Sequence, residues 1–151
     1  MIWSLFFTFL AACGAAAATG AIFKPGEWYD GLVKPSWFPP KWVFPVAWTT
    51  LYVLMAWSAT RVAVLPGNGQ AMAFWAVQIA LNTLWTPIFF GLHRMKAALV
   101  VMALLWLSVA ATLGSFLSLD FWAGAMFVPY LLWVTIASAL NISAVRLNPG
   151  Q

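Results

Sequence analysis

Charged side chains are scarce in this chain of 151 residues, making up only 7% of it, whereas an ordinary soluble domain carries about 25%. Hydrophobic residues make up 64% of the sequence, which leaves too few polar side chains to cover a globular core. We therefore expect an integral membrane protein. The net charge of +4 would suggest nucleic-acid binding in a soluble chain. Here the few cations are better interpreted as topology markers and contacts to anionic headgroups, with no nucleic-acid partner.

Groups that usually carry catalysis or bind metals are equally rare. The only acids are Glu27, Asp30 and Asp120, and His93 is the only histidine. No acid has a basic partner that would mark an acid/base pair, and no phosphate loop or nucleophile elbow is present. The sequence thus offers no conventional catalytic residues and no metal site. His93 as an axial haem ligand is one alternative, but a loop histidine beside Arg94 is more often simply solvated.

A single cysteine, Cys13, excludes an intrachain disulfide. Residues 10–13 resemble a lipoprotein cleavage site, but the first ten residues contain no Lys or Arg, so the basic start of a signal peptide is missing. We expect Cys13 to be a small packing residue. The chain also lacks an ionisable group in the middle of any apolar run, which argues against a proton-driven transporter and leaves a passive channel open.

What is present is a series of long apolar runs, each near the roughly 20 residues that cross a bilayer as a helix. We predict an all-α membrane protein, a single five-helix transmembrane domain over residues 1–151. Its predicted spans are 2–23, 42–64, 71–92, 97–119 and 121–146, with a structured loop at 24–41. Arg61, near the end of the second span, is expected to snorkel to the headgroups.

The basic residues lie almost entirely on one side of this arrangement. The first long loop, the turn at 93–96 and the C-terminus carry Lys24, Lys34, Lys41, Arg94, Lys96 and Arg146, whereas the other side has only Arg61. The positive-inside rule then predicts an N-terminus outside and a cytoplasmic C-terminus.

The segment 34–52 (KPSWFPPKWVFPVAWTTLY) is rich in tryptophan and proline. Its prolines exclude a regular helix in the first half, which predicts a rigid lid. Phe44, Trp48 and Tyr52 recur every four residues and share one helix face. Two interpretations stay open for Trp48 and Trp133: they line a cavity, or they are core packing. Membrane-interface belts explain Trp3, Trp122 and Trp42.

The third span carries the most polar group inside the membrane, because Gln78 and Asn82 lie four residues apart on one face. An amide in hydrocarbon needs a partner, either across helices or on a ligand. Pro87 is expected to kink this helix near Thr83, and Pro45 and Pro129 could act similarly in their spans.

Small residues at Ala73, Ala76 and Ala80 form a flat ridge on a different face of the same span. Ala76 and Ala80 have the spacing that lets two helices approach closely. We predict a homodimer through this ridge, with packing inside one bundle as the alternative.

Three segments resemble signatures of the TspO/translocator protein family, the tryptophan-rich sensory proteins, in its bacterial branch. These segments are 37–48 (WFPPKWVFPVAW, followed by Leu51 and Tyr52), 81–91 (LNTLWTPIFFG) and 128–133 (VPYLLW, with Leu140 and Asn141). The similarity extends from about Phe6 to Leu147. It implies a five-helix bundle, commonly a homodimer, that binds porphyrins such as protoporphyrin IX and haem, sterols such as cholesterol, and benzodiazepine-type ligands.

The resemblance also implies site residues. Trp48 and Asn82 would contact polar groups of the ligand, Trp133 and Ala137 would form a wall, and Trp28 and Trp37 would form the lid. Together with Phe44 and Tyr52 these are the predicted ligand-binding residues, with Trp133 as a candidate redox residue. One departure concerns sterol: residues 140–146 (LNISAVR) lack the tyrosine of the animal members' cholesterol motif.

Three functions are therefore weighed. The first is a receptor or sensor that binds porphyrin and regulates tetrapyrrole metabolism. The second is an enzyme that degrades porphyrin in light and oxygen, which needs a bound photosensitiser and an oxidisable indole rather than an acid/base pair. The third is a transporter of porphyrin or sterol. None of them requires an obligatory cofactor, since porphyrin or haem would be the ligand.

Overall fold

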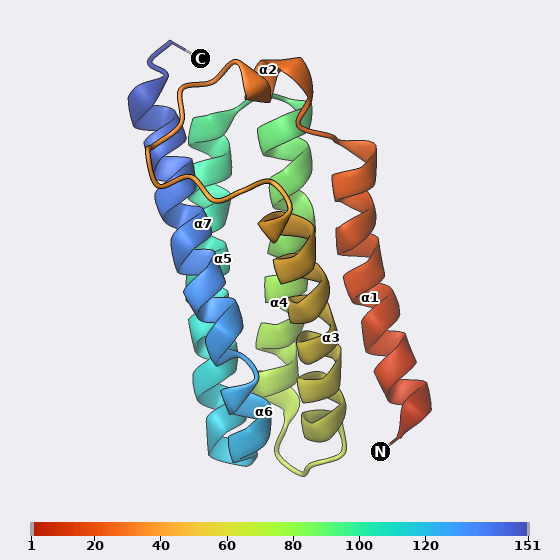
Figure 1. Cartoon of the computed structure of the whole chain (residues 1–151). Coiled ribbons are helices and arrows are strands. Elements are labelled where there is room, and N and C mark those ends of the chain that lie inside the picture. Colours follow the sequence, from red (N-terminus) through yellow and green to blue (C-terminus); the bar gives the residue numbers. More distant parts are fainter. Residues whose placement is uncertain (1, 151) are drawn as a thin grey trace.

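The computed structural model describes residues 2–150 as a bundle of long helices (Figure 1). The long helices are α1 (Trp3–Ile22), α3 (Val43–Ala63), α4 (Gly69–Thr86), α5 (Met95–Leu119) and α7 (Val128–Leu147). Two short helices, α2 (Gly26–Asp30) and α6 (Phe121–Ala125), and a π-helical turn at Pro87–Gly91 complete the elements. Five segments are long and apolar enough to cross a membrane. The predicted five-helix membrane bundle is confirmed.

The bundle has two distinct ends (Figure 1). We call one the lid end: it holds α2, the irregular segment 31–42, the π turn and the C-terminus. The other, called the closed end, holds the N-terminus, the turn between α3 and α4, and α6. Because the segment 31–42 has no regular helix, the prediction that its prolines prevent one is confirmed.

The prolines act differently from what the sequence suggested. Pro45 and Pro129 lie in the first turns of α3 and α7, where a missing N–H costs no helical bond, so neither kinks its helix. The fifth span is instead interrupted ahead of Pro129, between α6 and α7. Pro87 is followed by a wider turn in which the Leu92 amide donates to the Pro87 carbonyl at 2.9 Å. The disturbance expected near Thr83 thus lies one turn later.

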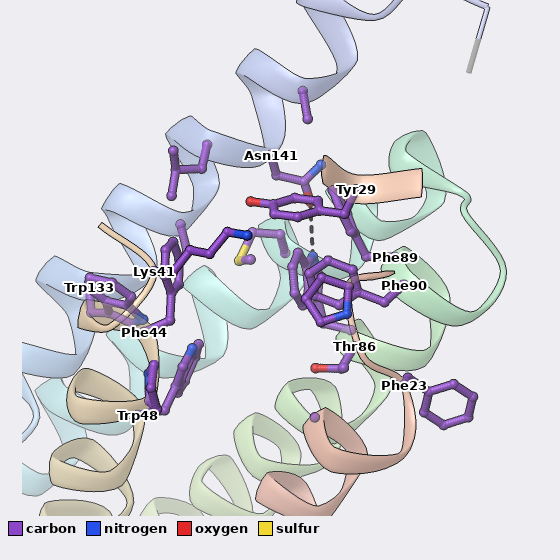
Figure 2. Close-up of a pocket in the computed structure, with 18 of the residues that line it drawn as sticks. Phe23, Tyr29, Lys41, Phe44, Trp48, Thr86, Phe89, Phe90, Trp133 and Asn141 are labelled. Atoms are coloured by element: carbon purple, nitrogen blue, oxygen red, sulfur yellow. Dashed lines mark hydrogen bonds between the residues drawn. The ribbon is translucent and has the colours of Figure 1, made fainter. Parts of the chain in front are cut away.

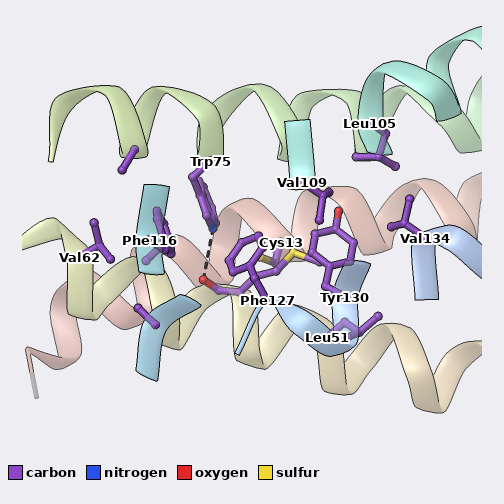
Figure 3. Close-up of a cluster of buried hydrophobic side chains, with 14 of the residues drawn as sticks. Cys13, Leu51, Val62, Trp75, Leu105, Val109, Phe116, Phe127, Tyr130 and Val134 are labelled. Carbon is purple, nitrogen blue, oxygen red and sulfur yellow. Dashed lines mark hydrogen bonds between the residues drawn. The ribbon is translucent and has the colours of Figure 1, made fainter. Parts of the chain in front are cut away.

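A dense core fills the closed end and the middle of the bundle (Figure 3). Phe116, Phe127 and Val62 are all 0% exposed, and Cys13 is buried among them as a small packing residue. The indole N–H of Trp75 donates to the Met55 carbonyl at 3.3 Å, so even this buried polar group has a partner. Side chains of α1, α3, α4, α5 and α7 meet in this core and hold the long helices together.

One ion pair joins the elements at the closed end. Arg61 of α3 donates from Nε to Asp120 Oδ2 at 2.5 Å and from a terminal nitrogen to Asp120 Oδ1 at 3.2 Å. Asp120 also accepts from the Trp122 amide and so caps α6. The hydrogen bond from Arg61 holds the pKa of the Asp120 carboxyl below its usual range. Arg61, which was expected to snorkel to the headgroups, thus pairs with an acid in the turn between the fourth and fifth spans.

The outer surface of the long helices is apolar. Phe7, Leu107 and Leu132 are each about 60% exposed, as expected for side chains that face lipid. On α4 the residues Ala73, Ala76 and Ala80 are exposed, whereas Gln78 and Asn82 are buried. The two faces of this helix therefore point apart, as their spacing predicts.

Candidate functional site

A cavity of about 660 Å³ lies beneath the lid, at the lid end of the bundle (Figure 2). Its walls come from α1, α3, α4 with the π turn, and α7, and Met102 and Leu105 of α5 close its depth. The volume lies within the roughly 300–1,000 Å³ of small-molecule sites. Aromatic rings dominate the lining: Phe23, Tyr29, Phe38, Phe44, Trp48, Tyr52, Trp85, Phe89, Phe90 and Trp133.

The α3 wall is built as the four-residue spacing predicts. Phe44, Trp48 and Tyr52 all line the cavity, with the Trp48 and Tyr52 rings stacked at 5.6 Å. Across from them, Trp133 of α7 makes edge contacts with Phe44 at 5.6 Å and with Trp48 at 6.3 Å. Ala137, one turn further along α7, also lines the cavity. Flat aromatic faces at right angles thus form a corner in which a flat apolar molecule can stack.

Polar groups at the floor form one continuous hydrogen-bond chain across three helices. The Tyr52 hydroxyl donates to Asn82 Oδ1 at 3.0 Å, and Asn82 Nδ2 donates to the Tyr130 hydroxyl at 2.8 Å. Tyr130 in turn donates to Gln78 Oε1 at 2.8 Å. Asn82 also lines the cavity, so both interpretations of its amide, an interhelical bond and a ligand contact, are compatible with its position.

Two partners in this region were missed by sequence reasoning. Tyr130 is 1% exposed and satisfies both buried amides of α4. Asn141 accepts from the Trp85 indole at 3.0 Å and donates to the Met95 carbonyl at 3.2 Å. Both lie within the segments that carry the family resemblance. A search of α7 for polar side chains on the Trp133 face would have found Tyr130, three residues earlier on the same side.

Trp133 carries an unusual polar group for a cavity wall. Its indole N–H is buried and has no hydrogen-bond partner among the residues that the structure describes. An unpaired buried donor costs about 1–3 kcal/mol, so an acceptor placed beside it would be favourable. Trp106, by contrast, donates to Thr135 Oγ1 at 2.9 Å on the outer surface and does not line the cavity.

The lid covers the cavity with different residues from those expected. Trp28 lies outside the lining: its ring stacks on His93 at 4.1 Å and contacts Phe89 at 5.7 Å. Trp37 is 50% exposed and also lies outside. Residues 28 and 29 point to different sides of the short helix α2, and it is Tyr29 that faces the cavity. Tyr29 and Phe38 thus take the place that the resemblance gave to two tryptophans.

His93, considered as a haem ligand, is likewise outside the cavity lining. It follows the π turn with a left-handed backbone, φ 56°, and is exposed. Among residues 2–150, no three His, Cys, Asp or Glu side chains gather closely enough to hold a metal ion.

The lid is fastened to the bundle at one place in particular. The Asn148 side chain accepts from the Val33 amide at 2.8 Å and donates to the Val33 carbonyl at 2.9 Å, which ties the lid to the end of α7. Next to it Leu32 is buried near Phe89 and Met95. Beyond this anchor, Lys34, Phe38 and Lys41 reach the rim of the cavity.

On the side of α1 and α3 the wall is thin. The residues Ala17, Gly20, Pro45 and Thr49 line the cavity and are themselves exposed on the outer surface. A hypothetical side chain at Gly20 would meet nothing within 4 Å. Aromatic rings thus line the cavity toward the interior of the bundle, and small side chains separate it from the lipid on the side of α1 and α3.

Comparison with known proteins assigns the chain to a family. The model of the TspO/MBR family matches residues 2–147. A tryptophan-rich sensory protein of Cereibacter sphaeroides is 63% identical over 148 residues, covering 98% of this chain and 94% of that protein. Protein CrtK of Rhodobacter capsulatus is 59% identical over 100% of this chain and 97% of its own length. The human translocator protein is 36% identical over 94% of this chain and 89% of its own length. This chain is therefore an integral, multi-pass membrane protein that belongs to the TspO/MBR family.

Proposed function

We propose that this protein is a membrane sensor that binds a porphyrin, such as protoporphyrin IX or haem, in the lid-end cavity. Family membership supports the broader role of a membrane sensor or translocator. The single observation that carries the proposal is the cavity itself, which has a volume of about 660 Å³ and is lined largely by aromatic rings, with few polar groups among them. A porphyrin is a flat apolar macrocycle with two carboxylates at one edge. Its shape and polarity match such a site.

Each part of the ligand has a proposed contact. The macrocycle stacks on Trp48 and lies against Trp133, because aromatic faces favour offset or edge-on neighbours. At the floor, the side-chain amide of Asn82 donates one of its two N–H groups to the Tyr130 hydroxyl, so the second N–H can donate to a polar atom of the ligand. The carboxylates stay at the rim near the lid, where water and cations are within reach.

Titration of purified protein with protoporphyrin IX, followed by tryptophan fluorescence, tests this site. We expect saturable quenching, and about tenfold weaker binding in Trp48→Ala and Asn82→Ala because each removes a central contact. Trp122→Ala is the matched control, since Trp122 is 61% exposed at the closed end. Unchanged affinity in both cavity variants would show that the ligand binds elsewhere.

Light-driven breakdown of the bound porphyrin is the second candidate function. The observation that favours it is Trp133, an indole on the cavity wall whose N–H has no partner among the described residues. The excited porphyrin would take one electron from the adjacent indole, and O2 would add to a methine carbon of the resulting porphyrin radical anion and open the ring there, with the oxidised indole as the other product. Bleaching of illuminated porphyrin should then slow in Trp133→Phe, and an equal rate in wild type and variant would refute a role for this indole.

We further propose a homodimer and an orientation. The exposed ridge of Ala73, Ala76 and Ala80 would meet a second copy, and Ala76→Leu with Ala80→Leu should abolish the dimer while porphyrin binding persists. A double variant that still crosslinks as a dimer in membranes would assign the interface to another helix.

The cations at the lid end favour a cytoplasmic lid and C-terminus, with the N-terminus outside.

A further inference from the structure

Two lysines of the lid line the cavity, and they differ in what holds their ammonium groups. Lys34 is enclosed by the lid itself: Nζ donates to the Tyr29 carbonyl at 2.8 Å and to the Leu32 carbonyl at 3.3 Å. The same ammonium lies 4.6 Å from the centre of the Tyr29 ring. Its hydrogen-bonding capacity is therefore used in shaping the turn of the lid, and it has little left for a ligand.

Lys41 is bound much more loosely. Its ammonium donates to Asp30 Oδ1 at 3.2 Å, while the side chains of Lys41 and Asp30 are 78% and 55% exposed. Both residues line the cavity. Figure 2 shows the Lys41 side chain extending among the residues that line the cavity, in the direction of Tyr29. An ion pair this exposed contributes little stability, so a competing carboxylate can break it.

Apart from Lys34, no other charged side chain among residues 2–150 lines the cavity beside this pair. Lys24, Arg94, Lys96 and Arg146 do not line the cavity, and neither does Glu27, the other acid of the lid. Tyr29 stays neutral at physiological pH, because burial, aided by the charge of Asp30, raises the pKa of its phenol to about 12. Among the residues that line the cavity, Lys41 and Asp30 are thus the one exposed pair of opposite charges.

We propose that Lys41 is a binding seat for the carboxylate of an apolar ligand, and that Asp30 occupies this seat as an internal competitor. The inference rests on the proposed function, since it needs an apolar body held in the cavity. When the ligand binds, its carboxylate replaces Asp30 at the Lys41 ammonium. Asp30 turns to water, which costs little because its side chain is already half exposed. The pair therefore makes the cavity discriminate by charge as well as by shape.

Two consequences distinguish this role from a mere fastening of the lid. A ligand whose carboxylates are free should bind more tightly than its neutral ester, and added salt should weaken only the acid. Loss of the Asp30 carboxylate should strengthen binding of the acid and leave the affinity for the ester unchanged. If the pair only held the lid closed, breaking it would change the binding of acid and ester by the same factor.

The experiment measures the affinity of protoporphyrin IX and of its dimethyl ester, as two probes, for the full chain in neutral detergent. In Asp30→Asn we expect about two- to fivefold tighter binding of the acid and no change for the ester. Glu27→Gln is the matched control, because it removes the same charge from the same short helix outside the cavity lining. An equal gain in Glu27→Gln would mean that the overall charge of the lid, rather than the seat, sets the affinity.

The second arm removes the cation. Lys41→Gln should weaken binding of the acid until its affinity equals that of the ester. The double variant Lys41→Gln with Asp30→Asn should bind the acid no more tightly than Lys41→Gln alone, because the binding seat no longer exists. Lys24→Gln, a lid cation outside the lining, should leave both probes unchanged. A gain for the acid that persisted without Lys41 would overturn the assignment.

The outcomes also separate this inference from the proposed function. If neither probe binds wild type, the porphyrin site itself is wrong. If both bind wild type equally and every variant leaves the ratio of acid to ester unchanged, porphyrin binding stands and the carboxylate seat is refuted.

Discussion

At the closed end, Phe116, Phe127 and Val62 have no exposed surface, and Arg61 joins α3 to the start of α6 through Asp120. At the lid end, the same long helices enclose about 660 Å³ that side chains do not fill. The exposed ion pair there, Lys41 with Asp30, is a weak one. The closed end is therefore a densely packed core, whereas the lid end encloses a cavity beneath a weakly held lid.

The difference matters because apolar burial gives helices little reason to associate within lipid. Close packing and satisfied polar groups supply the association energy instead. The closed end has both, so we expect it to supply most of the stability of the bundle. At the lid end, the side chains that line the cavity lack dispersion contacts on the side that faces it. A ligand that fills it regains those contacts, which couples binding to the stability of the lid end alone.

The largest expected effect comes from removing one ring at each end. Phe127→Ala should lower the free energy of unfolding by about 3 kcal/mol or more, because a fully buried ring leaves a cavity behind. Phe44→Ala, on a wall that is already hollow, should cost clearly less. Unfolding in mixed detergent micelles compares the two variants. Equal losses at both ends would contradict the division of roles.

The next effect concerns the hydrogen-bond chain that lies between the two ends. Asn82→Ala leaves the hydroxyls of Tyr52 and Tyr130 without their shared partner, and should cost about 1–3 kcal/mol of stability. It should also weaken porphyrin binding, since Asn82 lines the cavity. Ser138→Ala is a control, because that hydroxyl bonds only to its own helix. A variant that lost affinity at unchanged stability would assign Asn82 to the ligand alone.

The smallest effect is a pH dependence at the closed end. The folded pKa of Asp120 is lowered by Arg61, so its contribution to stability is present above the unfolded value of about 3.9 and is lost as pH falls through the folded value. Asp120→Asn should remove this loss in acid and cost at most about 1 kcal/mol near neutral pH. Thermal unfolding from pH 6 to pH 2 measures it. Porphyrin affinity at neutral pH should not change.

Sequence patterns predicted the helices and their faces well, because both depend on local spacing. Charge-free runs marked the spans, and the period of four placed Phe44, Trp48 and Tyr52 on one wall of the cavity. The same reasoning set the exposed alanines of α4 apart from Gln78. It could not show that the fifth span breaks ahead of Pro129, because apolar composition alone does not reveal where a helix restarts.

What spacing could not supply was the choice of partner. Arg61 pairs with Asp120 and Tyr130 with both α4 amides because separate helices bring them together, and a single sequence carries no signal for such contacts. The lid shows the same limit. Whether Trp28 or Tyr29 faces the cavity depends on how a five-residue helix is tilted, and a shift of one position exchanges the two.

Hydrogen–deuterium exchange with and without protoporphyrin IX tests most directly the central claim that the ligand binds at the lid end. The lid segment 31–42 lacks regular helical bonds, so those of its amides that have no hydrogen-bond partner should exchange rapidly and become protected when porphyrin binds. Residues 116–127 at the closed end should exchange at the same rate in both samples. Protection of the lid with an unchanged closed end is the result that we predict. Equal protection at both ends, or none in the lid under saturating porphyrin, would contradict the account.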